Sequence, residues 1–145
     1  QTPAAGIWTV RVYNTQRFKG TFHMWLPVQG MISEETVFLR PDPYSTITVP
    51  GNSRLPITVG AYDTSTGGIY IHSSRGYISR DSVKPDLAAP GVQIYGPVPG
   101  NRFGTRTGTS MAAAMITGYL AKELLEGNDV SVLKENKYIG VKEHG

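Results

Sequence analysis

An uncharged stretch from Met111 to Leu120 is the feature that most restricts how this chain can fold. Alanine, leucine and methionine favour the helical conformation, and they make up more than half of the stretch. A helix that is apolar on every side is predicted to be buried. Lys122 and Glu123 mark where the helix reaches water, and Gly127 is predicted to end it. Other elements must therefore surround this helix.

Ser110 lies directly before the apolar stretch, where a helix presents N–H groups without intrahelical partners. Its hydroxyl can cap the helix by accepting a hydrogen bond from an N–H two or three residues on. Alternatively, the hydroxyl can attack a carbonyl carbon while the same N–H groups stabilise the oxyanion that forms. Local chemistry alone favours the cap, because capped helices are common and nucleophiles are rare.

The middle of the chain predicts strands. Leu55–Asp63 is a nearly continuous apolar run, which is typical of a strand buried on both faces in a parallel sheet. Gly67–Ser74 predicts a second strand. Val83–Pro97 predicts a proline-rich loop followed by a short strand around Val92–Tyr95.

The first fifty residues predict β structure of a different kind. Short alternating runs are separated by glycine and proline, which favours a sandwich or jelly-roll. The candidate strands are Ile7–Asn14, Gly20–Pro27, Glu35–Arg40 and Ser45–Pro50.

Composition excludes several classes of function. The chain is 39% hydrophobic and 17% charged, which is typical of a globular protein, and its net charge of +3 is scattered rather than clustered. We therefore expect no nucleic-acid partner. The absence of cysteine excludes disulfides, thiolate metal sites and a cysteine nucleophile. No apolar run is long enough to span a bilayer, so we expect no membrane span.

The carboxylates are too dispersed in sequence to indicate a calcium site, and we expect no metal ion or cofactor. They are Asp42, Asp63, Asp81 and Asp86. Asp86 is expected to cap a turn rather than to bind a cation.

Three segments, Ile57–Asp63, Ser73–Val92 and Pro99–Ala114, are similar in order and spacing to the C-terminal half of the subtilase (subtilisin-like, peptidase S8) serine proteases. Within that family, Val83–Pro97 and the triple alanine after Met111 look most like the Csp germination proteases of clostridia. The resemblance implies that residues 50–145 form the C-terminal part of a three-layer α/β subtilisin-like domain with a mostly parallel sheet. Residues 1–49 would be the end of a jelly-roll insert.

The resemblance also assigns roles around the helix N-terminus. Ser110 matches the nucleophile, and its backbone N–H would be one oxyanion donor. Thr109 matches the neighbour that supports the oxyanion hole, and Met111 matches the methionine packed against the nucleophile. Ala114 and Met115 stand where most subtilases have a Pro-His pair that is not catalytic.

The partners of a serine nucleophile are not found in this sequence. The subtilase motifs for the catalytic Asp and His should lie upstream of the segments that match. His23, His72 and His144 lack the context of the catalytic histidine, and His72 is expected to be half-buried in a strand. Asn101 does not match the asparagine of the oxyanion hole.

Pro50 precedes Gly51 at a position where subtilases often have a cis-proline, although spacing alone supports that reading and an ordinary trans turn is expected.

These residues predict the nucleophile-bearing part of a serine endopeptidase with a protein or peptide substrate. We expect it to be inert alone and to be completed by an N-terminal portion of the same protease. Similarity to the Csp proteases implies zymogen activation in spore germination and an extracellular or spore-associated location in an anaerobic bacterium. Two alternatives stay open. One is a pseudoprotease that binds or signals without catalysis, and the other is a β-sandwich interaction module in which Ser110 caps a helix.

Overall fold

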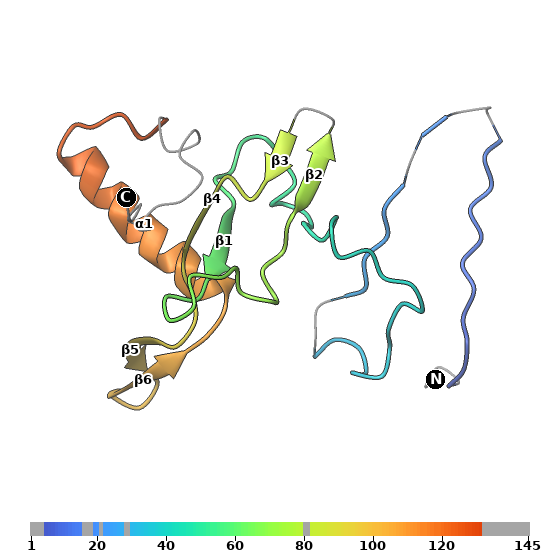
Figure 1. Cartoon of the computed structure of the whole chain (residues 1–145), viewed down its shortest axis with the longest axis horizontal. Helices are drawn as coiled ribbons and strands as arrows, with labels where there is room; N and C mark the ends of the chain where they lie inside the picture. Colours follow the sequence, from blue (N-terminus) through green and yellow to red (C-terminus); the bar gives the residue numbers. More distant parts are fainter. Residues whose placement is uncertain (1–4, 16–18, 21, 28–29, 80–81, 132–145) are drawn as a thin grey trace.

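Two short parallel strands form the centre of the structure, a computed structural model that describes residues 5–15, 19–20, 22–27, 30–79 and 82–131 (Figure 1). β1 (Val59–Tyr62) pairs with β4 (Leu87–Pro90), with Val59 opposite Leu87 and Tyr62 opposite Pro90. In each strand three of the four residues are buried. The prediction of a buried parallel strand within Leu55–Asp63 is confirmed, whereas β4 occupies a segment predicted to be a loop.

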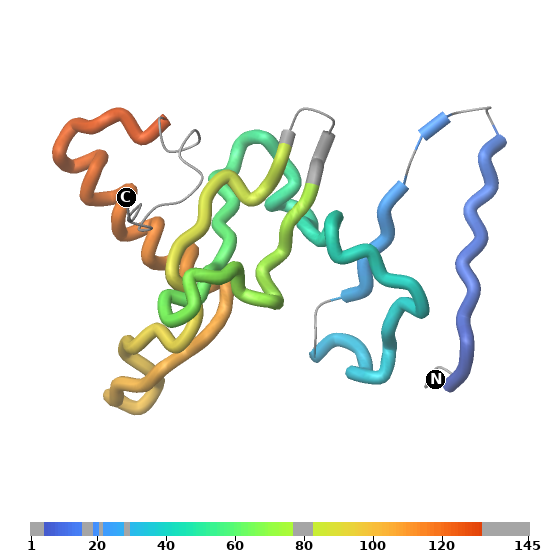
Figure 2. Tube along the Cα trace, in the orientation of Figure 1, coloured from blue at the N-terminus to red at the C-terminus, as the bar shows by residue number. Residues whose placement is uncertain are grey.

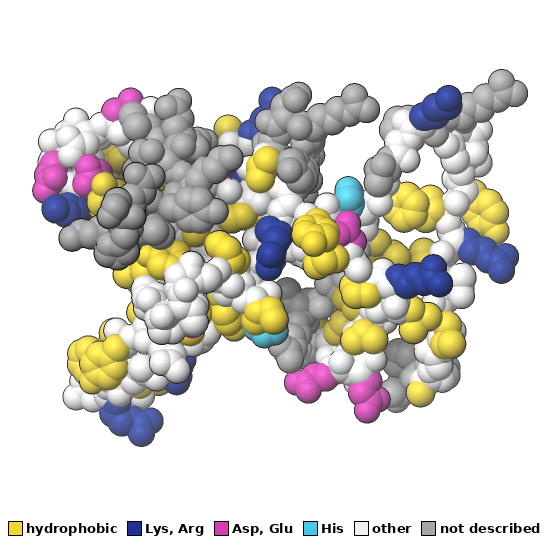
Figure 3. Space-filling view, in the orientation of Figure 1, with side chains coloured by type: hydrophobic (Ala, Val, Ile, Leu, Met, Phe, Trp, Pro, Cys, Tyr) yellow, Lys and Arg dark blue, Asp and Glu magenta, His cyan; other side chains and the backbone are white. Residues whose placement is uncertain are grey.

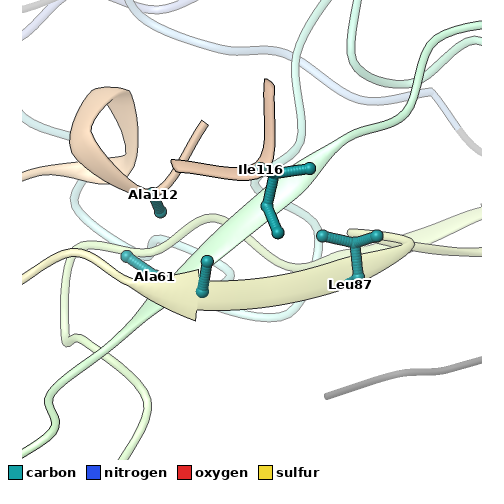
Figure 4. Close-up of a cluster of buried hydrophobic side chains, with 5 residues drawn as sticks. Ala61, Leu87, Ala112 and Ile116 are labelled. Carbon is teal, nitrogen blue, oxygen red and sulfur yellow. The ribbon is translucent and has the colours of Figure 1, made fainter. Parts of the chain in front are cut away.

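The helix α1 (Thr109–Leu125) covers one face of this strand pair. Figure 4 shows Ala112 and Ile116 of the helix directed toward Ala61 of β1 and Leu87 of β4. Because three of the five side chains of this cluster are alanines (Ala61, Ala89 and Ala112), the helix backbone can lie close to the sheet. The partly buried side chains packed against this cluster are Ile57, Val59, Tyr70 and Leu120.

The other sides of α1 do not contact the described part of the chain closely. Only Ala112 and Ile116 of the helix are buried, whereas Met115 is 45% and Tyr119 is 38% exposed. The prediction that this helix is buried on every side is therefore wrong for the described residues. The reason is geometric, since a two-stranded sheet packed against one side of a helix leaves the other sides of that helix uncovered.

The helix ends where the sequence predicts. Gly127 adopts φ +79°, its N–H donates to the Leu124 carbonyl, and the Asn128 N–H donates to the Glu123 carbonyl. This pair of bonds is a Schellman motif, which requires a left-handed residue and therefore favours glycine.

Two antiparallel hairpins flank the parallel pair. β2 (Gly76–Ser79) pairs with β3 (Ser82–Lys84), and β5 (Ile94–Val98) pairs with β6 (Arg102–Arg106). The β5–β6 hairpin extends away from the core and leads directly into α1 (Figure 1). β5 begins two residues after the strand predicted from Val92 and continues beyond it.

The structure assigns no strand to the described residues before Val59, where the sequence predicts four. Figure 2 shows this segment extended at its start and looped closer to β1, and Figure 3 shows many of its hydrophobic side chains open on the surface. Alternating strands gain stability by pairing, and in the described ranges these residues find no strand partner. The jelly-roll assignment of residues 1–49 stays a prediction. Gly67–Ser74 also contains no strand, although an isolated bridge joins Tyr62 and Ile69.

Candidate active site

Ser110 is the second residue of α1, and its side chain is exposed. The residue that caps the helix is Gly108, with φ 154°, and no side chain caps the N-terminus. The alternative reading from local chemistry, in which the Ser110 hydroxyl caps the helix, is therefore wrong. In the part of the chain that the structure describes, its hydroxyl makes no hydrogen bond. A solvent-facing hydroxyl on the first turn is available to an incoming molecule.

Some N–H groups around the first turn of α1 donate hydrogen bonds within the chain, and others have no acceptor among the described residues. The Gly108 N–H donates to the Gly91 carbonyl at 2.7 Å, and the Met111 N–H donates to the Gly108 carbonyl at 3.0 Å. Thr109 and Ser110 have no acceptor for their N–H groups within the described residues, as expected for first-turn positions. The open Ser110 N–H is thus attached to the residue that carries the hydroxyl, where the helix dipole also favours negative charge.

Gly91 fixes the position of this helix end. It follows β4 directly, and its N–H donates to the Tyr62 carbonyl at the end of β1. A Cβ at Gly91 would lie 2.6 Å from the Ala61 Cβ and 2.9 Å from the Gly108 carbonyl oxygen. Both distances are shorter than van der Waals contact, so glycine is required where the two strands meet the helix. Ser110 consequently lies near the carboxyl ends of the parallel strands, the edge where open α/β sheets bind ligands.

The neighbours of Ser110 are less exposed. Thr109 and Met111 are both half-buried, on either side of the exposed Ser110 in sequence. The loop before the helix is tied down, because the Gln93 N–H donates to the Thr107 hydroxyl at 2.9 Å. The chain on both sides of the β5–β6 hairpin is thereby joined just before the helix begins.

Asp63 directly follows β1 and begins a hydrogen-bonded turn. Its carboxylate accepts hydrogen bonds from the Ser65 hydroxyl at 2.7 Å and the Ser65 N–H at 2.8 Å. These bonds, the side-chain bond first, hold the pKa of Asp63 below its ordinary value.

No histidine of the described residues contacts Ser110. His72 is exposed in a turn, with its ring 5.3 Å from that of Tyr70, so the expectation of a half-buried strand histidine is wrong. His23 is exposed beside Trp25. His144 lies outside the described residues. A base for Ser110 is therefore not supplied by the described residues.

The structure also places several other residues that the sequence analysis singles out. The bond before Pro50 is cis, not the trans turn that was expected, and the bond before Pro85 is cis as well. Asn101 lies in the turn between β5 and β6, with φ 54°. Asp86 accepts the Thr58 N–H at 2.7 Å and also pairs with Lys84, a contact the sequence prediction missed. Within the described ranges, no cluster of three or more His, Cys, Asp or Glu could hold a metal ion, and no helix has the length and hydropathy to cross a membrane. Arg80 and Asp81 lie outside these ranges.

Residues 40–136 match the model of the subtilase family, peptidase S8. The chain belongs to the subtilase family. It is 28% identical over 95 residues to the C5a peptidase of Streptococcus pyogenes serotype M1, covering 66% of this chain and 8% of that protein. It is also 47% identical over 49 residues to a subtilisin-like protease of Coccidioides posadasii, covering 31% of this chain and 12% of that protein.

Among solved structures, the CspB protease of Clostridium perfringens matches with a TM-score of 0.56 and 38% identity. The match covers 59% of this chain and 19% of that chain. The subtilisin-like α/β fold and the similarity to Csp proteases are therefore confirmed. This subtilase chain spans less than a fifth of the relatives named here.

Proposed function

We propose that this chain carries the nucleophile of a serine endopeptidase that acts on a protein or peptide substrate. The observation that carries the proposal is the exposed Ser110 hydroxyl on the first turn of α1, beside an open N–H of the same residue. Subtilase membership supports the same chemistry. Thr109 would support the oxyanion hole and Met111 would pack against the nucleophile.

The reaction is an acyl transfer. The Ser110 Oγ forms a bond to the scissile carbonyl carbon, and its proton passes to a histidine supplied by an upstream portion of the protease. The Ser110 N–H donates to the oxyanion of the tetrahedral intermediate. The C–N bond then breaks, and the histidine gives the proton to the leaving amine. Water hydrolyses the acyl-enzyme, which releases the acid and restores the Ser110 hydroxyl.

The partner in this proposal is the N-terminal portion of the same protease, which would bring the catalytic Asp and His. The exposed apolar residues of α1 support such a partner, because a helix that is apolar on several sides is typical of one that other elements surround. The exposed large apolar residues of the helix are Met115, Tyr119, Leu124 and Leu125. The upstream portion would also supply the remaining layers of the domain and the rest of the jelly-roll insert.

A fluorophosphonate probe tests the activity. With the upstream portion present, the probe should label Ser110, identified by peptide mass mapping, and Ser110→Ala should abolish labelling. This chain without the upstream portion should remain unlabelled. Absence of labelling in the assembled protein would instead favour a pseudoprotease that binds or signals. The interaction-module alternative is weakened already, since Gly108 and not Ser110 caps the helix.

Similarity to the Csp proteases supports one setting for this activity. The substrate would be a cortex-hydrolase zymogen in spore germination, and the protease would be extracellular or spore-associated. The assembled protein should cleave such a zymogen at one site, the Ser110→Ala variant should not, and cleavage of casein at an equal rate would argue against a dedicated substrate.

A further inference from the structure

Lys84, the last residue of β3, is buried with a charge that the proposed mechanism does not use. Its side chain is 2% exposed, and its Nζ lies 2.6 Å from the Oδ2 of Asp86. The same Nζ donates to the Pro56 carbonyl at 2.9 Å. Burying an ammonium is costly unless its donors are satisfied, so these contacts hold Lys84 in one place. A second ion pair, between Lys122 and Glu126 of α1, is by contrast exposed, with 3.7 Å between Nζ and Oε1.

The contacts of Lys84 and Asp86 join the two segments that enter the parallel sheet. Pro56 precedes β1, and Asp86 precedes β4. The Asp86 carboxylate also accepts the Thr58 N–H, and the Asp86 N–H donates to the Thr58 carbonyl at 2.9 Å. Three bonds thus connect the start of β4 to the start of β1, and the Lys84–Asp86 pair links the side chains that make two of them.

The other end of β4 determines the position of the helix N-terminus. β4 has four residues, so the ion pair at Asp86 and the contact at Gly91 lie at opposite ends of one short strand. The Gly91 carbonyl accepts the Gly108 N–H, two residues before Ser110. A shift of β4 along β1 would therefore displace the first turn of α1.

We propose that Lys84 is a positioning residue for Ser110, acting through β4 and the Gly91–Gly108 contact. The proposal rests on the proposed function of Ser110 as a nucleophile. It assigns the buried ammonium a role in the geometry of the reaction in addition to its role in packing.

A cavity beside the ion pair makes the proposal testable by chemical rescue. Its volume is about 410 Å³, and its lining includes Lys84, Asp86, Gly60 and the exposed Arg75. Lys84→Ala removes the equivalent of propylammonium, which is small enough to enter this cavity. Tetramethylammonium carries the same charge but has no N–H to donate, and it serves as the control cation.

The experiment uses the protein assembled with its upstream portion, at a temperature where circular dichroism shows every variant folded. Lys84→Ala should lower the rate of fluorophosphonate labelling of Ser110 by about tenfold or more, because small misplacements of a reacting group are costly. Hydrogen exchange at the Gly108 amide should become faster. Propylammonium should restore both quantities in a saturable way, and tetramethylammonium should not. Lys122→Ala, in the exposed pair, should change neither.

Each result decides the proposal. Unchanged labelling or unchanged Gly108 exchange in Lys84→Ala overturns it, and so does a loss that propylammonium does not restore. If Lys84→Ala fails to fold, Lys84→Met keeps the apolar volume without the donors and should show the same slow labelling and fast exchange. If Ser110 is not labelled even in the unaltered protein, the proposed function fails, and Gly108 exchange alone then decides whether Lys84 positions the helix.

Discussion

Replacing Gly91 by alanine should damage the reaction more than the fold. The added Cβ would lie 2.6 Å from the Ala61 Cβ and 2.9 Å from the Gly108 carbonyl oxygen. Carbon atoms in contact are normally ~3.5–4.0 Å apart, so relief of the clash requires a movement of roughly 1 Å. Ala61 is fully buried in the sheet, whereas Gly108 belongs to the helix end, so we expect the helix N-terminus to move.

Overpacking of this kind costs about 1–3 kcal/mol in the free energy of unfolding. A displacement of ~1 Å at a reacting group can slow the chemistry about 100-fold. We therefore expect Gly91→Ala to slow fluorophosphonate labelling of Ser110 between about 10- and 100-fold in the assembled protein. The assay measures the second-order labelling rate and, by denaturant titration, the free energy of unfolding of the same sample.

Gly96→Ala is the matched control, because a Cβ at Gly96 in β5 meets nothing within 4 Å. It should change the stability by less than about 0.5 kcal/mol and leave labelling unchanged. Equal labelling rates in the two variants would refute the reasoning. So would a rate loss in Gly91→Ala that disappears once the rate is corrected for the unfolded fraction.

Three further outcomes follow from the described contacts. Peroxide should slow fluorophosphonate labelling of Ser110 in the unaltered protein, because methionine sulfoxide at the half-buried Met111 is larger and more polar than methionine. Labelling of the Met111→Leu variant should resist peroxide. An equal loss of labelling in both proteins would disprove that Met111 lies beside Ser110. Ser65→Ala should raise the pKa of Asp63 toward its ordinary value in a carboxyl NMR titration. The pKa of Asp63 is lower in the folded than in the unfolded protein, so the bonds to Asp63 stabilise the fold at pH values above the unfolded pKa. This stabilisation is lost as the pH falls through the folded pKa. The prediction would be contradicted if the stability difference between Ser65→Ala and the unaltered protein grew on acidification. Gly127→Ala should destabilise the assembled protein by about 1 kcal/mol in denaturant titration, because φ +79° strains any residue with a Cβ; no change would mean that the helix end frays without cost.

The sequence predicts the centre of the fold better than its periphery. The apolar run before Asp63 identifies β1, and the uncharged run after Ser110 identifies α1, because both patterns report burial directly. The sequence does not predict β4 because Leu87, Ala88 and Ala89 lie between Pro85 and Pro90, and prolines in a short segment favour a loop over a strand. The prolines are tolerated because Pro85 precedes the strand and Pro90 ends it.

Predictions that depend on distant partners fare worse. The alternating residues around Trp8 form no strand in the described ranges. Alternation in the sequence indicates that one side of a strand is apolar, but it does not say which other strand would pair with it. The local alternative of a cap at Ser110 lies two residues away from the observed one, because Gly108 can take the positive φ that begins this helix. The pairing of Lys84 with Asp86 has a local signal, the Lys-Pro-Asp sequence, but burial of the lysine depends on Pro56, which is far away in sequence.

The Gly91–Gly108 contact has a consequence for how the sequence of such a protein can diverge during evolution. The bond joins a main-chain carbonyl to a main-chain N–H, so no neighbouring side chain takes part in it. Substitutions around Ser110 can accumulate without altering this support, provided that both glycines remain. Side chains near Ser110 are then free to diversify, while the hydroxyl and the N–H of Ser110 keep their places.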